Sequence, residues 1–151
     1  MKKAIIMGVM SLLLICPLFA YAQVSPVISV SVSADELILD GVPSGFDAKS
    51  FALRIKKNIK SNLEDKTYTI NNEKYDYSAE VEVDSVAHKL RPFHFKAQYR
   101  VEYSYKIMDA NKKIIYKAKS HRINEDVADV AGEIAYDVMY YIWTYAPLPG
   151  Q

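Results

Sequence analysis

Alternating hydrophobic and polar positions mark the β-strands of this chain. In the run QYRVEYSYKI, residues 98–107, every second side chain is apolar or aromatic, which is the period of a strand. Residues 77–87, YSAEVEVDSVA, alternate apolar positions with serine and acids, and residues 27–34, VISVSVSA, alternate them with serines. A further strand is expected at residues 67–70, and residues 37–39 are an option for a short extra one. Each long strand therefore has one apolar and one polar face.

A hairpin is predicted where residues Asp109–Lys112 separate two alternating runs. If Asp109 lies opposite Lys112, then Tyr105 faces Tyr116 on the apolar side. On the polar side Glu102 then faces Lys119. This register joins apolar residues to apolar ones and an acid to a base, so we adopt it as the prediction.

Two amphipathic helices are predicted. The first follows Asp47 as N-cap, buries an apolar residue every fourth position from Phe51 to Leu63, and has a basic outer face. The second follows Asn124 as N-cap and ends before Pro147. Residues 47–63 carry a net charge of +4 and residues 125–146 carry −5. If the helices pack side by side, we expect their flanks to pair across the groove between them; alternatively, the two charged faces serve two partners. The acids of the second helix exclude a membrane span.

The predicted order β-α-β-β-β-α defines an α+β fold, a two-layer sandwich. Because the polar faces of all strands agree, an antiparallel-rich sheet has one wet face and two helices on its dry face. Tyr99, Tyr103 and Tyr105 lie on the dry face. They are thus predicted to be core residues, and a base-stacking platform is not indicated because the open face is charged.

The amino terminus has the residue pattern of a secretory signal peptide. Residues 1–22 combine two lysines, an apolar run and a closing Ala-Tyr-Ala, which predicts cleavage between Ala22 and Gln23; the alternative is an uncleaved anchor. Cys16 follows Ile15, whereas a lipidated cysteine needs a small residue before it, so lipid anchoring is not expected. Residues 23–151 then form a single domain in the periplasm.

The mature chain has no cysteine, which excludes disulfides, thiolate metal sites and cysteine nucleophiles. Removal of Lys2 and Lys3 from the 19 basic residues leaves 17 against 18 acidic residues, so nucleic-acid binding is not indicated. His88 and His94 could converge on a metal, but no carboxylate lies within the loop between them, and the acid pairs of the strands lie on a solvated face. We therefore expect a non-enzymatic protein with no metal and no cofactor.

The runs YDYSAEVEVDSVAHKL, YRVEYSYKIMDANKKIIYKAKS and EDVADVAGEIAYDVMYYI resemble the small α/β sandwiches of Gram-negative envelope proteins. This group includes the TolB amino-terminal domain, the lipopolysaccharide-assembly lipoprotein and the auxiliary lipoproteins of ABC-type transporters. The resemblance spans residues 27–145. It implies a non-catalytic protein that braces or delivers other envelope components. The chain departs from many of these relatives in lacking the lipidation cysteine, so a soluble periplasmic protein is expected.

The loop at residues 88–96, HKLRPFHFK, mixes positive charge with aromatic residues, notably Lys89, Arg91, Phe93 and Lys96. Such a mixture suits an anionic lipid or other amphiphile, a membrane surface or the acidic patch of a partner. The alternative is a basic hairpin loop whose phenylalanines tuck under the sheet edge.

The aromatic end of the second helix is the other candidate site. Met139, Tyr140 and Trp143 fall away from the predicted buried stripe, and tyrosine and tryptophan often anchor protein interfaces. Alternatively, residues 147–151 or 35–45 fold over them. Two functions follow: an envelope accessory or adapter that binds another envelope protein, with self-association as an option, or a periplasmic module that binds a small molecule or lipid through residues 88–96.

Overall fold

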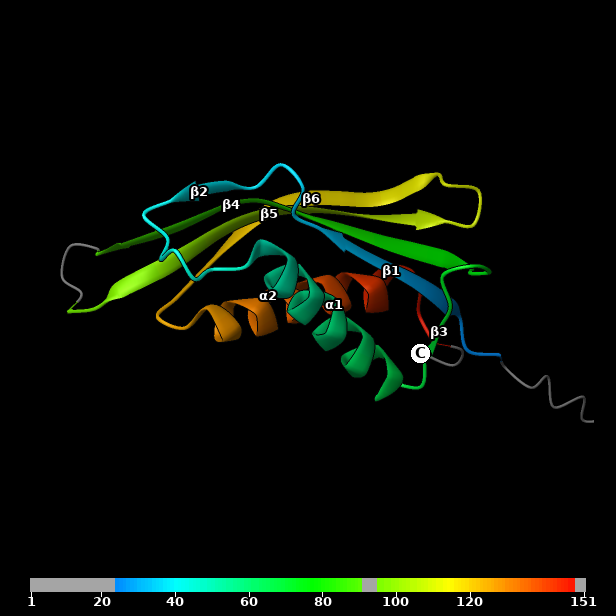
Figure 1. Ribbon diagram of the computed structural model, residues 1–151. Coiled ribbons are helices and arrows are strands. Elements are labelled where there is room, and N and C mark those ends of the chain that lie inside the picture. The colour runs from blue at the N-terminus through cyan, green and yellow to red at the C-terminus, as the bar shows by residue number, and fades with distance from the viewer. Residues whose placement is uncertain (1–23, 91–94, 149–151) are drawn as a thin grey trace, which may run out of the picture.

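The computed structural model describes residues 24–90 and 95–148, and in them six strands form one sheet with two helices on one face (Figure 1). The elements in chain order are β1 (Val27–Ser33), β2 (Ile38–Asp40), α1 (Ala48–Glu64), β3 (Thr69–Ile70), β4 (Tyr77–Leu90), β5 (Ala97–Asp109), β6 (Ile114–Asn124) and α2 (Val127–Tyr145). The predicted two-layer α+β sandwich is confirmed. Both short segments expected from the sequence, near residues 38 and 69, contribute strands.

The sheet is mixed, with strand order β3-β1-β4-β5-β6. β1 is parallel to β3 and β4, and β2 is parallel to β4, whereas the two longest ladders, β4–β5 and β5–β6, are antiparallel. β1 pairs with residues 77–82 of β4, and β2 pairs with residues 85–87. This order makes β6 an edge strand whose only strand neighbour, within the described residues, is β5.

The register of the β5–β6 hairpin differs from the predicted one by two residues. Tyr105 pairs with Ala118, and Glu102 pairs with His121, not with Lys119. The predicted pairing of Glu102 with Lys119 across the hairpin is therefore wrong. The assignment of faces is unaffected, because a slip of two residues returns each side chain to the same face of the sheet.

Two single-residue shifts produce this difference. At the tip, Lys112 adopts a positive φ of 62°, and Asp109 bonds through its backbone N–H to the carbonyl of Lys113, so one residue more than expected enters the turn. A second irregularity lies between Ile107 and Met108. Each adds one residue to one side of the ladder, as a bulge does.

The core lies between the sheet and the helices. Tyr103, Val101 and Ile107 of β5 are completely buried, as predicted for the dry face of this strand. Tyr105 is 5% exposed and Tyr99 is partly buried. α1 packs below β1 and β3, and α2 packs below β5 and β6, which places the helices side by side (Figure 1). The opposite face of the sheet is polar and carries the ion pairs Glu80–Lys106 and Asp84–Lys119.

Side chains cap both helices. Asp47 caps α1 as predicted, accepting a hydrogen bond of 3.0 Å from the backbone N–H of Lys49. The N-cap of α2 is Asp126, not Asn124. Asn124 is the last residue of β6, so the chain needs two more residues to turn into the helix, and the Asn124 side chain instead accepts a bond from the Asp126 backbone at 3.3 Å.

Gly41 allows the chain to leave β2. Its φ is +66°, and a Cβ at this position would lie 2.8 Å from the carbonyl oxygen of His88 on the neighbouring β4. Only glycine adopts this backbone conformation without strain and leaves room for that oxygen.

Candidate protein-interaction surface

The outer flank of β6 and the adjoining face of α2 form the most distinctive surface of the protein. β6 is eleven residues long, and its outer side has no paired strand among the described residues. Beside it lie four tyrosines, one on β6 and three on α2: Tyr116, Tyr140, Tyr141 and Tyr145. We call β6 together with these four tyrosines the edge surface.

Ring contacts hold the tyrosines in one array. The ring of Tyr116 stacks on Tyr141, with centroids 4.5 Å apart and planes at 13°, and on Tyr145 at 4.9 Å and 22°. Tyr141 meets the buried Tyr105 at 5.6 Å and contacts Tyr140 edge-on at 5.3 Å. Aromatic pairs in these geometries add about 0.5–1.5 kcal/mol beyond their buried area. The array is thus a pre-ordered surface connected to the core.

Burial increases from the rim of the array to its inner end. Tyr140 is 54% exposed, Tyr116, Tyr141 and Tyr145 are partly buried, and Tyr105 is buried. Burial raises the pKa of Tyr105, with a smaller contribution from the neighbouring hydroxyls of Tyr116 and Tyr141. Hydrogen bonding to Tyr141 raises the pKa of Tyr116. A phenolic hydroxyl can donate and accept hydrogen bonds, so the surface offers both apolar rings and polar groups.

An ionic anchor holds α2 against β5 and β6 next to this array. Asp137 of α2 accepts a hydrogen bond from the Tyr103 hydroxyl and forms an ion pair with Arg122 of β6. Burial, followed by the hydrogen bond to Asp137, raises the pKa of Tyr103. One helical turn earlier, the side-chain amide of Asn124 donates to Glu133 at 3.0 Å. The completely buried Tyr103 ring therefore keeps a hydrogen-bond partner for its hydroxyl.

The structure separates the two aromatic residues that the sequence grouped on α2. Tyr140 belongs to the edge surface. Trp143 is partly buried on the side toward α1, where the ammonium of Lys66 lies 5.0 Å from the centre of its ring. The indole nitrogen is buried and has no hydrogen-bond partner among the residues that the structure describes.

Met139 was predicted to lie away from the buried stripe, and this prediction is wrong, because Met139 is a core residue only 7% exposed. α2 packs against α1 as well as against the sheet, so its apolar stripe is wider than contact with the sheet alone requires.

The hydroxyl of Tyr68, in the connection after α1, donates to the Ala146 carbonyl at 2.8 Å and fixes the end of α2.

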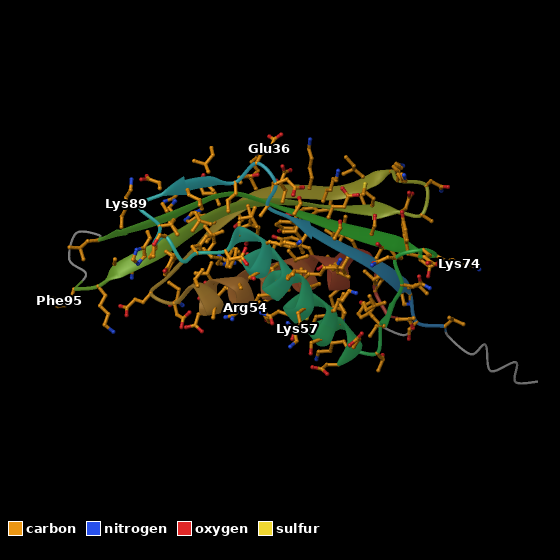
Figure 2. All side chains as sticks on the ribbon, viewed as in Figure 1. Glu36, Arg54, Lys57, Lys74, Lys89 and Phe95 are labelled. Carbon is orange, nitrogen blue, oxygen red and sulfur yellow. The ribbon has the colours of Figure 1, made fainter. Side chains whose placement is uncertain are left out.

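The basic-aromatic loop is described only at its two ends, and Arg91 and Phe93 lie outside the described residues. Lys89 forms an ion pair with Asp40, and Lys96 lies 3.2 Å from Glu125. Leu90 is 66% exposed and Phe95 is fully exposed at the end of the β4–β5 hairpin (Figure 2). The described loop residues thus lie at the far end of the sheet from the aromatic end of α2, as parts of a different surface.

The expected charge pairing between the helices does not occur. Among residues 24–90 and 95–148, no ion pair joins α1 to α2, and the α2 acid Asp137 pairs with β6 instead. The described part of the chain holds no group of three or more potential metal-ligating side chains. Neither described helix is long and apolar enough to cross a membrane.

The open face of the sheet bears a shallow hollow of about 480 Å³ across β1, β4, β5 and β6. Most residues that line it carry hydroxyls or charges of both signs, including Ser31, Glu82 and Lys117, and Val81 and Ala118 also contribute. A second hollow of about 330 Å³ lies where Tyr99 meets the start of α1. Both open to solvent, and neither is the deep apolar cavity that a lipid-binding module needs.

Solved structures share this fold. The hypothetical protein CT253 from Chlamydia trachomatis superposes with a TM-score of 0.53 at 8% identity, over 82% of this chain and 98% of that one. The PelC dodecamer from Paraburkholderia phytofirmans superposes with a TM-score of 0.50 at 14% identity, over 76% of this chain and 86% of that one. For a minor lipoprotein from Acinetobacter baumannii the TM-score is 0.49 at 12% identity, over 81% of this chain and 95% of that one. No protein-family model matches the chain, and no curated protein is significantly similar to it.

At these low identities the likeness establishes the fold. The chain shares the α+β sandwich of CT253 and of PelC, so the resemblance drawn from its sequence is confirmed at the level of the fold.

Proposed function

We propose that this is an exported, non-catalytic accessory protein of the Gram-negative envelope, which binds another protein through the edge surface. One observation carries the proposal: within the described residues, an eleven-residue strand is unpaired along its outer side, directly beside the ordered array of partly exposed tyrosines. Tyrosine is among the residues that contribute most to protein–protein affinity. No cofactor, metal or nucleic acid is needed for this function.

The two parts of the edge surface have complementary roles. The backbone groups of β6 can receive an extended segment of a partner, which gives affinity, and the tyrosines select its side chains. An unguarded edge would also invite indiscriminate pairing. Lys117 and Lys119 project from β6 on the open face, and charged side chains of this kind disfavour aggregation through an edge. The surface therefore suits a specific partner.

Export supports the envelope assignment. Residues 1–22 have the pattern of a cleaved signal, and the fold is shared with envelope proteins. We expect cleavage after Ala22 and no lipid on Cys16. The intact mass of the exported product measures this directly, and a mass that includes a diacylglycerol-modified Cys16 would contradict it.

A second copy of this chain is one form that the partner can take. PelC, which shares the fold, is a dodecamer, and two β6 edges can in principle extend one sheet into the next. A different envelope protein is the other form. Sedimentation velocity of the purified protein at several concentrations distinguishes them: a homomeric partner gives a concentration-dependent mass, and a heteromeric one leaves a monomer.

Co-purification with matched variants tests the proposal. Tyr140→Ala removes an exposed ring of the edge surface and is expected to lower partner recovery from envelope extract at least tenfold. Phe95→Ala removes an even more exposed ring at the opposite end of the sheet and is expected to leave recovery unchanged. Equal recovery with Tyr140→Ala and with the parent protein, at equal folded fraction, would contradict the proposal.

The same pair of variants tests the alternative, an amphiphile-binding module that uses residues 88–96. The full exposure of Phe95 and the 66% exposure of Leu90 favour this alternative, since aromatic and leucine side chains next to lysines suit a lipid interface. Mass spectrometry of lipids that co-purify with each variant measures it. Loss of a bound lipid with Phe95→Ala but not with Tyr140→Ala would assign the function to the loop.

A further inference from the structure

The outer face of α1 carries positive charge that the rest of the protein does not neutralise. Within α1, five basic residues stand against the single acid Glu64: Lys49, Arg54, Lys56, Lys57 and Lys60. In the described residues none of these five forms an ion pair, although six ion pairs form elsewhere. Figure 2 shows Arg54 and Lys57 on the side of α1 that faces away from the sheet.

The placement of these charges does not stabilise the helix. Its first turn contains no acid and its last turn contains no base, whereas the helix dipole favours the opposite arrangement. Lys56 and Lys60 are four residues apart, and like charges at this spacing repel on a helix surface. Features that oppose local stability in this way are typical of functional sites.

An apolar residue lies within the charged face. Leu53 is 57% exposed and lies four residues from both Lys49 and Lys57, so the three share one row along the outer side of the helix. Lys66, just beyond the helix, lies over the ring of Trp143 and extends the cationic face past the end of α1. The face thus combines a strip of cations with a leucine in its middle.

We propose that this α1 face, defined by the five basic residues and Leu53, docks the exported protein on a membrane surface of anionic phospholipids. Lysines supply most of the charge, and lysine is depleted at protein–protein interfaces but attracted to anionic headgroups as a point charge. Leu53 inserts at the boundary between headgroups and acyl chains, as the apolar residues of interfacial helices do.

The net charge of the protein does not explain such binding, because the chain without its signal carries 17 basic and 18 acidic residues. Attraction to an anionic membrane therefore depends on the local α1 face. This face lies under β1 and β3, on the other flank of the molecule from β6, so a docked protein keeps its edge surface free (Figure 1). Docking through α1 shares the expectation of export with the proposed function, but it does not require partner binding through the edge surface.

Vesicle co-sedimentation tests the docking. The exported protein is mixed with phosphatidylcholine vesicles with or without phosphatidylglycerol, at salt concentrations of about 0.1 M and about 0.5 M. We expect binding to the anionic vesicles only, weakened by salt. The triple variant Lys49→Gln, Lys57→Gln, Lys60→Gln is expected to bind about a hundredfold more weakly, which is about fivefold for each lost charge. Leu53→Ala is expected to weaken binding several-fold.

A triple variant on the open face and hairpin, Lys113→Gln, Lys117→Gln, Lys119→Gln, is the matched control and is expected to bind as the parent does. Equal loss in both triple variants would show a net-charge effect and overturn the inference, as would equal binding to vesicles without phosphatidylglycerol or no binding at all. Binding to a polyglutamate peptide through α1, without binding to anionic vesicles, would assign the face to an acidic protein and also overturn it. Circular dichroism verifies that each variant is folded.

Discussion

Replacement of Tyr103 by phenylalanine removes one hydroxyl from the anchor that joins α2 to the sheet. The ring of Tyr103 is completely buried, and its hydroxyl donates to Asp137, whose other carboxylate oxygen pairs with Arg122. The carboxylate keeps the arginine in the variant, so it is not left unpaired. The lost bond is one to a charged acceptor, which contributes about 1.5–3 kcal/mol, and we expect Tyr103→Phe to lower the free energy of unfolding by about that amount.

Tyr103→Ala also removes the ring, and truncation of a buried aromatic residue typically costs about 3–5 kcal/mol. Glu102→Ala, at the next position on the same strand, is the control. The Glu102 side chain lies on the open face and pairs with Arg100 at 3.0 Å where both are well exposed, so its removal is expected to change stability by less than about 0.5 kcal/mol.

Urea denaturation followed by circular dichroism measures these changes, and Asp137→Asn completes a double-mutant cycle with Tyr103→Phe. We expect a coupling energy of about 1 kcal/mol or more between the two positions, because they are in direct contact. A neutral Tyr103→Phe, or a coupling energy near zero, would refute the anchor. Equal and small effects of Tyr103→Ala and Glu102→Ala on stability would show that the Tyr103 ring is exposed, which would contradict its place in the core.

Three further predictions concern other parts of the fold. Gly41→Ala is expected to destabilise the protein by about 1–3 kcal/mol because of the positive φ at this position and the nearby His88 oxygen. Gly132→Ala, in a helix with free space around it, is expected to stabilise the protein by about 0.5–1 kcal/mol. Thermal melts that rank the two variants in the reverse order would contradict this. Burial raises the pKa of Tyr105 above its unfolded value of about 10, so the stability that this residue contributes is full below about pH 10 and is lost as the pH rises further. The urea midpoint of Tyr105→Phe should therefore fall less steeply with pH above about pH 10 than that of the parent protein. Identical pH dependence of the two midpoints would be evidence against this. Lys66→Ala is expected to increase acrylamide quenching of Trp143, the only tryptophan, and unchanged quenching would show that Lys66 does not cover the ring.

The periodicity of the sequence was sufficient to predict the faces of the long strands. Alternation in β5 placed Tyr103 and Tyr105 in the core, and both are there, because side chains alternate strictly across a strand. The hairpin register was harder to predict. It depends on the left-handed conformation of Lys112 and the irregularity at Ile107–Met108, which change the count by one residue each and leave no mark on the hydrophobic pattern.

Neighbours that are distant in sequence account for the other differences. The burial of Met139 depends on the packing of α2 against α1, and the helical period of α2 alone does not contain that information. The edge surface depends on strand order, since the position of β6 at the end of the sheet leaves its outer side without a paired strand in the described part of the chain. Tyr140 could be found from its place outside the α2 stripe, but its association with Tyr116 of β6 required the fold.

Photocrosslinking in living cells tests the central claim most directly. A p-benzoylphenylalanine residue placed at Tyr116 or at Tyr140 projects from the edge surface, and the same residue placed at Ser31 projects from the open face of the sheet. The account predicts a discrete protein adduct from the first two positions and none from the third. Adducts from Ser31 alone, or equal adducts from all three positions, would contradict partner binding through β6 and its tyrosines.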